Sequence, residues 1–311
     1  MKLHEFKEDF SVLIESISNR YGIRADILEK DYYVTLLLEE LSKEQDQLYA
    51  YFKGGTAIYK ALSSIKRFSE DIDLTVSTEG CPTKSQEQKR LECATLKYKS
   101  LTKGDTLENK RGTITCEYLY DSIFSIDSDD ALQRFGKIKI ESTNFTISEP
   151  TEDLTIAPHL YELSDEQYQK LLRENYDVKP FIIKTISLER IFIDKIFAAE
   201  FYFERNVLMD VAKHVYDLAV LIENDKIIRF LSNKQEVERI IALKRKEEEI
   251  RKGGVSVDKN ITDFTYFDNL AGNMDFRSKF EAMQKIYVFR KEDYIGVDKV
   301  LRSLEKIREM L

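Results

Sequence analysis

Two aspartates one residue apart are the first candidates for chemistry, in the stretch DIDLTV from Asp71 to Val76. Side chains alternate between the faces of a strand, so Asp71 and Asp73 share one face while the apolar residues lie on the other. Two carboxylates that close repel each other unless a cation lies between them, and an all-oxygen site suits Mg²⁺. The pattern therefore predicts a divalent-metal site on the polar face of a half-buried strand.

A glycine turn precedes this strand and predicts a phosphate site. Gly54, Gly55 and Thr56 interrupt an apolar run and open a helical pattern. At such a turn the backbone N–H groups and the helix dipole point at the same spot, where a phosphate can bind. A phosphate site followed by paired aspartates indicates metal-assisted handling of a nucleoside triphosphate. Lys66 and Arg67, between the two motifs, either neutralise that triphosphate or form an ordinary solvated charge pair.

A lysine within an apolar helical arc is the next candidate. Ser187 is expected to cap a long helix that begins at Leu188. On a helical wheel Lys195 lies among the apolar side chains of that helix. A buried lysine is rare unless it is paired, so Lys195 needs either a carboxylate or a phosphate as its partner.

The next expected helix, residues 207–222, separates its residues into two faces. One face is an apolar stripe, and Asp210, His214 and Asp217 share another at helical spacing. His214 is either a catalytic base or an ordinary hydrogen-bonding residue between helices. The mixed-charge helix that follows Asn224 is expected to present a solvated face.

Alternation in the stretch from Lys137 to Glu141 predicts another strand, with Lys137, Lys139 and Glu141 on one face. A similar pattern over residues 111–119 places Glu117 on the polar face of a further strand. Either strand could be an exposed edge that simply carries charges.

The sequences of these motifs resemble those of the AbiEii/AbiGii toxin family. Its members are the nucleotidyltransferase-like toxins of bacterial abortive-infection (phage defence) and type IV toxin–antitoxin systems. The closest matches are FKGGTAIYKA (52–61) with RFSEDIDL (67–74), and EKDYYVT (29–35) adds a second one. The family's E-R-x-x-x-x-K pattern is matched by Glu189, Arg190 and Lys195. KHVYDL (213–218) resembles its second C-terminal motif, with Lys213 where many relatives have arginine.

The resemblance implies transfer of a nucleoside monophosphate from an NTP to an acceptor, with Mg²⁺ or Mn²⁺ as cofactor. Asp71 and Asp73 would hold the metal together with a third carboxylate, Glu141 or its rival Glu117. The remaining residues implied to act on the nucleotide are Gly54, Gly55, Thr56, Lys66, Arg67, Lys195, Lys213 and Asp217, and Lys30 and Asp31 could also face it. In characterised relatives the acceptor is the 3′ end of tRNA, and a cognate antitoxin neutralises the toxin. The alternatives are a protein or small-molecule acceptor, or a non-catalytic nucleotide- or partner-binding module on a decayed transferase fold.

Length and composition indicate the domain organisation of the chain that carries these motifs. A chain of 311 residues with 42% hydrophobic and 33% charged residues is long enough for about two domains. We expect a nucleotidyltransferase-type α/β domain with a small mixed sheet at residues 1–165, and a helical domain at 166–311 that completes the site, joined by the polar stretch 148–166. The net charge of −8 disfavours indiscriminate nucleic-acid binding. Three widely spaced cysteines indicate free thiols in a reducing cytoplasm, and no apolar run is long enough to span a membrane.

Overall fold

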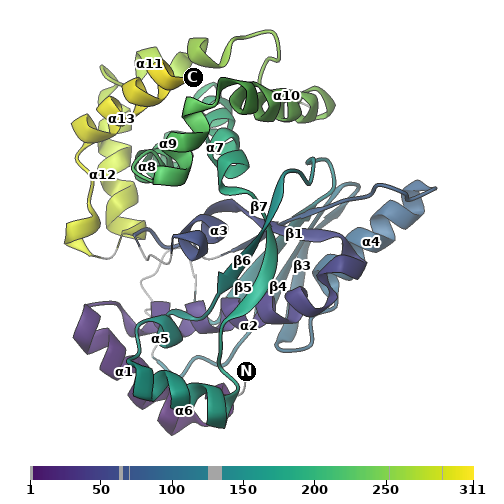
Figure 1. The fold of residues 1–311 in the computed structure, drawn as a ribbon, viewed down its shortest axis with the longest axis vertical. Coiled ribbons are helices and arrows are strands. Elements are labelled where there is room, and N and C mark those ends of the chain that lie inside the picture. Colours follow the sequence, from purple (N-terminus) through teal and green to yellow (C-terminus); the bar gives the residue numbers. More distant parts are fainter. Residues whose placement is uncertain (1–2, 63–65, 70, 125–134, 252, 289) are drawn as a thin grey trace. The chain divides into compact units, whose positions relative to one another are not determined.

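The computed structural model describes residues 3–62, 66–69, 71–124, 135–251, 253–288 and 290–311 (Figure 1). The chain divides into two compact units, Met1–Ile186 and Ser187–Leu311, which are called the first and second unit below. The fold is of the expected mixed α/β class, with a mixed sheet in the first unit and helices in the second.

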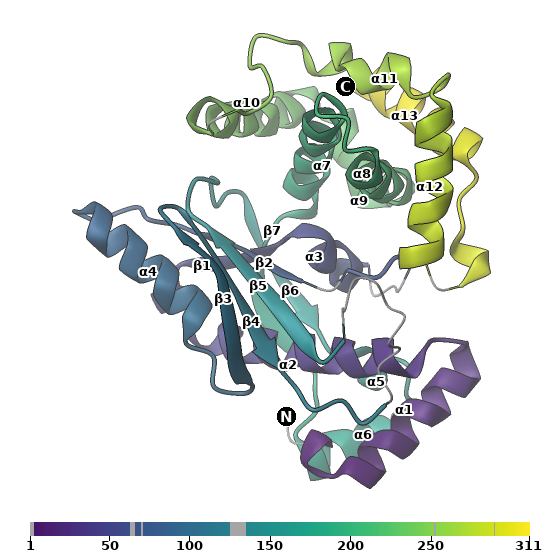
Figure 2. The same cartoon turned by 180° about the vertical axis from the view of Figure 1, so that it is seen from behind.

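The first unit is built on a mixed sheet that has seven strands in the described residues, in the order β3-β4-β5-β2-β1-β7-β6 (Figures 1 and 2). The pairs β2–β5 and β1–β7 are parallel, and the other neighbours are antiparallel. The strands are β1 (Ala50–Lys53), β2 (Ile72–Val76), β3 (Thr102–Lys110), β4 (Thr113–Leu119), β5 (Lys137–Thr143), β6 (Thr151–Ile156) and β7 (Phe181–Ile186). Its helices are α1 (Lys7–Tyr21), α2 (Ala25–Leu48), α3 (Gly54–Ala61), α4 (Lys84–Leu96), α5 (His159–Glu162) and α6 (Glu166–Tyr176), after a short 3₁₀ turn, η1 (Leu3–Glu5).

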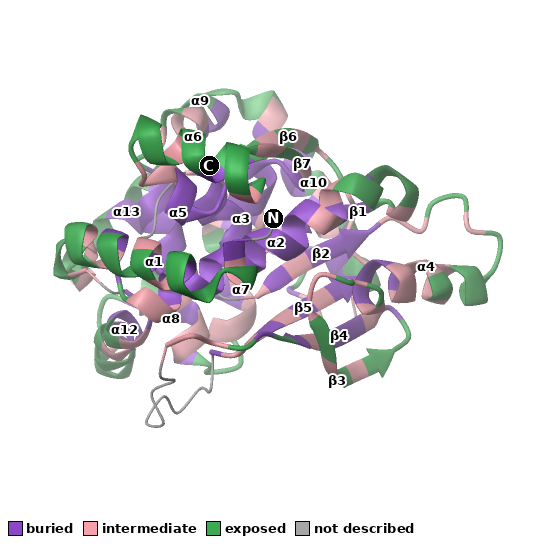
Figure 3. Cartoon of the chain, turned by 90° about the horizontal axis from the view of Figure 1, so that it is seen from below, coloured by how far each residue is buried: buried purple, intermediate pink, exposed green. Residues whose placement is uncertain are grey.

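The alternation expected in the central strands is confirmed. Ile72 and Leu74 of β2 and Ile138 and Ile140 of β5 are buried, whereas the residues between them are more exposed or polar. Helices α2 and α4 pack against these strands, and the Tyr118 hydroxyl of β4 donates to a backbone carbonyl of α4. Figure 3 shows buried residues gathered along α2 and the central strands, while the edge strand β3 is mostly exposed. Burial of one sheet face thus leaves the other face for polar side chains.

The stretch 148–166 is not a simple connection between two domains. It contains β6, which pairs with β7 over its whole length, and α5. The expected boundary between residues 165 and 166 therefore falls inside the first unit, since β7 at residues 181–186 also pairs with β1. Short polar strands at a sheet edge carry a weak sequence signal, because little of their surface is buried.

The second unit consists of helices. Its elements are α7 (Leu188–Phe203), α8 (Leu208–Leu221), α9 (Asp225–Ser232), α10 (Lys234–Ile250), α11 (Thr265–Asn269), α12 (Met274–Tyr287) and α13 (Val297–Met310), with the 3₁₀ turns η2 (Ile261–Asp263) and η3 (Lys291–Asp293). The Ser187 hydroxyl accepts a hydrogen bond from the backbone N–H of Arg190, so the expected N-cap of α7 is confirmed. The apolar stripe of α8 is buried as expected and packs against α7, α12 and α13.

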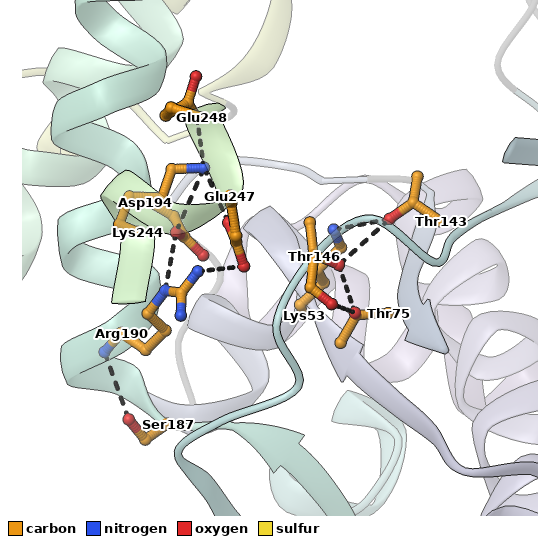
Figure 4. Close-up of polar contacts among 10 residues, drawn as sticks. All are labelled: Lys53, Thr75, Thr143, Thr146, Ser187, Arg190, Asp194, Lys244, Glu247 and Glu248. Atoms are coloured by element: carbon orange, nitrogen blue, oxygen red, sulfur yellow. Dashed lines mark hydrogen bonds and ion pairs between the residues drawn. The ribbon is translucent and has the colours of Figure 1, made fainter. Parts of the chain in front are cut away.

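Helix α10 presents the expected solvated face, on which Glu238, Lys246 and Glu249 are exposed, but another part of its charge is buried. Lys244, Glu247 and Glu248 are all buried. The ammonium of Lys244 lies 2.7 Å from Glu248 and 3.1 Å from Glu247, and the guanidinium of Arg190 pairs with Glu247 and with Asp194 (Figure 4). Lys244 thus pairs with Glu247 and Glu248 within α10, whereas Arg190 of α7 gives Glu247 a partner from a distant part of the sequence.

None of the helices in the described residues is long and apolar enough to cross a membrane. Cys81, Cys93 and Cys116 are free thiols, as expected from their number and spacing.

Helix α2 is buried on nearly all sides, and its charged residues have specific partners. The carboxylate of Asp31 lies 2.7 Å from the Lys60 ammonium and accepts a hydrogen bond of 2.7 Å from the backbone N–H of His159. Burial raises the pKa of Asp31, but the neighbouring His159 and Lys60 outweigh this effect and hold it below its ordinary value. Asp31 therefore ties α2 to α3 and α5.

We expect Asp31→Asn to destabilise the protein by about 3–5 kcal/mol, because it leaves the buried Lys60 ammonium without its counter-ion. Urea denaturation measures this loss, with Glu87→Gln as control, since Glu87 pairs with the exposed Lys84 and should cost less than about 1 kcal/mol. The Asp31 carboxyl has a depressed pKa, so its contribution is present above about pH 4 and is lost as the pH falls through the folded-state pKa. Equal losses for the two variants would contradict this role.

Candidate active site

In the first unit, the glycine turn lies directly against the strand that carries the paired aspartates. Gly54 is the first residue of α3 and has φ of +81°. A Cβ atom at this position would lie only 2.0 Å from a carboxylate oxygen of Asp73. Only glycine tolerates both this backbone conformation and this approach. The two sequence motifs therefore meet at one point, as their chemistry requires.

Asp73 and Glu141 lie side by side on neighbouring strands. In the parallel pair β2–β5, Asp73 is directly opposite Glu141, and β1 places Lys53 opposite Asp73 on the other side. Glu117, the rival to Glu141, lies one strand farther away on β4 and pairs with Lys137 at 2.7 Å. The register therefore favours Glu141 as the carboxylate that accompanies Asp73.

Asp71 lies just before β2, and its carboxylate is 2.7 Å from the ammonium of Lys139 on β5. Partial burial lowers the pKa of Lys139, but Asp71, with smaller effects of Glu141 and Asp73, raises it above its ordinary value. One cationic side chain thus lies in the field of all three candidate metal ligands.

Polar side chains at and near the glycine turn hold it in place. The Thr56 hydroxyl donates a hydrogen bond of 2.6 Å to the backbone carbonyl of Asp71, which ties α3 to the start of β2. Arg67 is buried, and its guanidinium lies 5.6 Å from the centre of the Tyr59 ring and next to Gly55. Lys66 is exposed. Of these two cations, Arg67 therefore shapes the turn, and Lys66 is the one that solvent reaches.

The first unit's residues fit a hard divalent cation in their donor chemistry. Asp73 and Glu141 supply carboxylate oxygens from adjacent strands, and Gly54 leaves room for the Asp73 carboxylate. Asp71 supplies a third carboxylate, which Lys139 engages. Within the described residues, no group of three or more acidic, histidine or cysteine side chains is already gathered closely enough to hold a metal ion. Mg²⁺ prefers oxygen ligands and usually takes only one or two carboxylates from the protein.

In the second unit, Lys195 of α7 is paired with a carboxylate, as expected for a lysine in a buried position. Its ammonium lies 2.9 Å from the carboxylate of Asp217 on α8, and Asp217 is completely buried. The two residues that resemble the family's C-terminal motifs therefore form one ion pair. The i, i+4, i+7 face expected for α8 does not act as a unit, because Asp210 pairs with Lys213 instead, at 3.0 Å.

Lys213 and His214 both contact aromatic rings. The Lys213 ammonium lies 4.8 Å from the centre of the Tyr287 ring. Partial burial lowers the pKa of Lys213, while Tyr287 and Asp210 raise it, and its pKa is above its ordinary value. The His214 ring stacks on Tyr202 of α7, with centroids 5.4 Å apart. His214 thus helps to pack α7 against α8.

Sequence reasoning assigned no role to Lys139 or Lys53, although both lie on the polar face of the sheet. Alternation placed Lys139 on the same face as Glu141, but its contact with Asp71 depends on the parallel pairing of β5 with β2. The ammonium of Lys53 donates a hydrogen bond of 3.3 Å to the hydroxyl of Thr143 (Figure 4). The sequence pattern indicated which side chains share the polar face of a strand. It did not indicate which strands are neighbours in the sheet.

Comparisons with known proteins confirm the family resemblance. A sequence profile described as nucleotidyl transferase AbiEii toxin, type IV toxin–antitoxin system, matches residues 36–299, which is most of the chain. Among solved structures, the chain is similar to a protein from H. pylori named as a candidate nucleotidyltransferase, with 12% identity, a TM-score of 0.44 and coverage of 89% of this chain and 92% of that one. It is also similar to JHP933 from Helicobacter pylori, with 12% identity, a TM-score of 0.33 and coverage of 89% and 94%. A search of curated proteins finds no significant match.

We expect Gly54→Ala to be far more damaging than Gly80→Ala. Both glycines have positive φ, +81° and +73°, so each change costs roughly 1–2 kcal/mol in backbone strain. At Gly80 an added Cβ meets nothing within 4 Å, whereas at Gly54 it would meet Asp73 at 2.0 Å. Urea denaturation should show an additional loss of at least about 1 kcal/mol at Gly54. If both variants lose the same stability, the close approach of Gly54 to Asp73 is not a real constraint.

Lys195→Met should destabilise the protein by about 3–5 kcal/mol, because it removes the positive charge that lies beside the buried Asp217 carboxylate. The double variant Lys195→Met/Asp217→Leu removes both charges and should recover most of that loss. Lys213→Met is the control on α8, because the Lys213–Asp210 pair is more exposed and should contribute less than about 1 kcal/mol. Thermal and urea unfolding of these variants measure the effect. Undiminished stability of Lys195→Met alone would show that the pair does not support the fold.

Proposed function

Because the chain belongs to the AbiEii family of nucleotidyl transferase toxins of type IV toxin–antitoxin systems, we propose that it transfers a nucleoside monophosphate from an NTP to an acceptor hydroxyl. The acceptor oxygen forms a bond to the α-phosphorus of the NTP. The bond from this phosphorus to the oxygen that bridges to the β-phosphate breaks, and pyrophosphate leaves. A carboxylate of the site takes the proton of the hydroxyl.

The single observation that carries the proposal is the meeting of Gly54 with Asp73 beside Glu141. It joins a helix N-terminus, which attracts phosphate, to oxygen ligands, which attract a divalent metal. A site with only one of these parts would suit a simple phosphate-binding or metal-binding module. Their contact is what a metal–nucleotide complex requires.

Each part has a distinct task in this proposal. Asp71, Asp73 and Glu141 hold Mg²⁺ or Mn²⁺, which when bound polarises the reacting phosphate and activates the attacking hydroxyl. The backbone N–H groups of Gly54, Gly55 and Thr56 bind the phosphates at the start of α3. In the first unit, Lys66 and Arg67 add positive charge that balances the triphosphate.

The Lys195–Asp217 pair of the second unit acts in this proposal as one group. An ammonium has three N–H donors, so a lysine that donates one to a carboxylate retains others for a phosphate. Asp217 holds the Lys195 ammonium in place at 2.9 Å on the buried side of the pair. Lys213 is a further cation on α8 that we assign to nucleotide binding, in the place where many relatives have arginine.

For the acceptor we propose the 3′ end of tRNA. The support is a group of exposed lysines on and after α4 in a chain of net charge −8, namely Lys89, Lys97, Lys99 and Lys103. Local positive charge of this kind attracts a polyanion even when the whole protein is acidic. The toxin–antitoxin character of the family also implies a cognate antitoxin that neutralises the activity.

The decisive experiment incubates the protein with Mg²⁺, each α-labelled NTP and total cellular RNA. We expect label in the tRNA fraction with the wild-type protein. Asp71→Asn and Asp73→Asn should each lower the rate by about 10²-fold or more, since each removes a charge that the transition state requires. Asp153→Asn, at an exposed position of β6 in the same sheet, is the matched control and should leave the rate unchanged.

The fate of the label decides between the proposals. Label in a protein or a small molecule instead of RNA would retain the transferase and overturn the tRNA acceptor. Absence of transfer with every NTP and every acceptor fraction would overturn the enzymatic function in favour of a binding module. Activity that survives in both aspartate variants would overturn the assignment of the metal ligands.

A further inference from the structure

The acidic face of the first unit already has a cation of its own. Lys139 of β5 lies on the same face as Glu141, two residues away, and its ammonium is 2.7 Å from the Asp71 carboxylate. The parallel register that sets Asp73 opposite Glu141 also brings Lys139 level with Asp71. The Lys139 ammonium therefore shares this part of the sheet with three carboxylates, and Lys53 of β1 lies opposite Asp73 on the other side.

The Lys139 side chain competes with a metal ion in two ways. It occupies an oxygen of Asp71 that a metal would need, and its positive charge repels a divalent cation at the short distances that neighbouring residues impose. Its side chain is only 36% exposed, so water screens this repulsion incompletely. In the protein without metal, the same charge reduces the mutual repulsion of Asp71, Asp73 and Glu141.

We propose that Lys139 is the resident counter-ion of this acidic site and sets its affinity for divalent metal, an inference that rests on the proposed function. Lys139 keeps the carboxylates together before the metal binds and weakens binding of the metal to the free protein. A triphosphate contributes its own oxygens and negative charge, so metal that arrives with a nucleotide overcomes this opposition. Lys139 is thus a residue that determines specificity for the metal–nucleotide complex over the free metal.

The neighbouring lysine on the same strand offers a matched control. Lys137 lies on the same face of β5, its side chain is also 36% exposed, and it pairs with a carboxylate at the same distance of 2.7 Å. Its partner, however, is Glu117, which lies on β4, away from Asp73. The two lysines therefore differ mainly in which carboxylate they neutralise.

The test is titration of the full chain with Mn²⁺ alone, followed by electron paramagnetic resonance of the free ion. Lys139→Met should bind Mn²⁺ about tenfold or more tightly than the wild type, because a unit charge near the metal is removed. Lys139→Arg and Lys137→Met should both stay within about threefold of the wild type, since the first keeps the charge and the second lies farther from the site. Asp73→Asn should bind Mn²⁺ more weakly than the wild type.

Thermal unfolding adds a readout that does not depend on activity. In EDTA, Lys139→Met should melt at a lower temperature than the wild type, because its carboxylates repel each other more strongly once the Lys139 charge is removed. Addition of Mg²⁺ should raise its melting temperature by more than that of the wild type, as tighter binding to the folded state requires. Lys137→Met should show no such extra response to Mg²⁺.

The possible results separate this inference from the proposed function. Mn²⁺ binding by the wild type that is equal to, or tighter than, binding by Lys139→Met overturns the role of Lys139 and leaves the transferase intact. An equal tightening in Lys137→Met also overturns it, since any nearby charge would then act alike. If neither the wild type nor Lys139→Met binds Mn²⁺ while Asp73→Asn still lowers nucleotide transfer, the inference fails and the transferase stands. Failure of both binding and transfer overturns both.

Discussion

The register between β2 and β5 is the constraint on which the site depends. Ile72 and Leu74 of β2 and Ile140 of β5 must face the buried side of the sheet, so Asp73 and Glu141 must face the other side together. A slip of one residue would bury the carboxylates and expose the apolar side chains, which is prohibitively costly. The same register places Lys139 beside Asp71. Core packing on one face of the sheet therefore determines the electrostatics of the other.

The two units use ion pairs in different ways. In the first unit, the Lys139–Asp71 pair is partly exposed, so its partners can separate at modest cost and accept a ligand. In the second unit, Lys195 and Asp217 are buried together, and separation would leave a charge in an apolar environment. Exposure, rather than distance, distinguishes the pair that can rearrange from the pair that supports the fold.

The second unit also contains a larger buried network, in which Arg190, Asp194, Lys244, Glu247 and Glu248 join α7 to α10 (Figure 4). The backbone N–H of Val255 donates to Glu248 as well, so this carboxylate also orders the chain that leaves α10. Asp194 directly precedes Lys195. A network that fixes this part of α7 therefore also fixes the helix that carries the Lys195–Asp217 pair.

The sequence by itself determined the local features of this protein. Alternation identified the faces of β2 and β5, the glycine pair located the start of α3, and Ser187 marked the cap of α7, because each of these depends on residues a few positions apart. Tertiary structure alone decided that Asp73 lies opposite Glu141, that Asp217 is the partner of Lys195, and that Lys244, Glu247 and Glu248 of α10 are buried. It also placed β6 at the edge of the sheet and β7, which lies beyond the expected domain boundary, beside β1. These outcomes depend on which distant segments bury their apolar faces against each other, and no local pattern of residues encodes that choice.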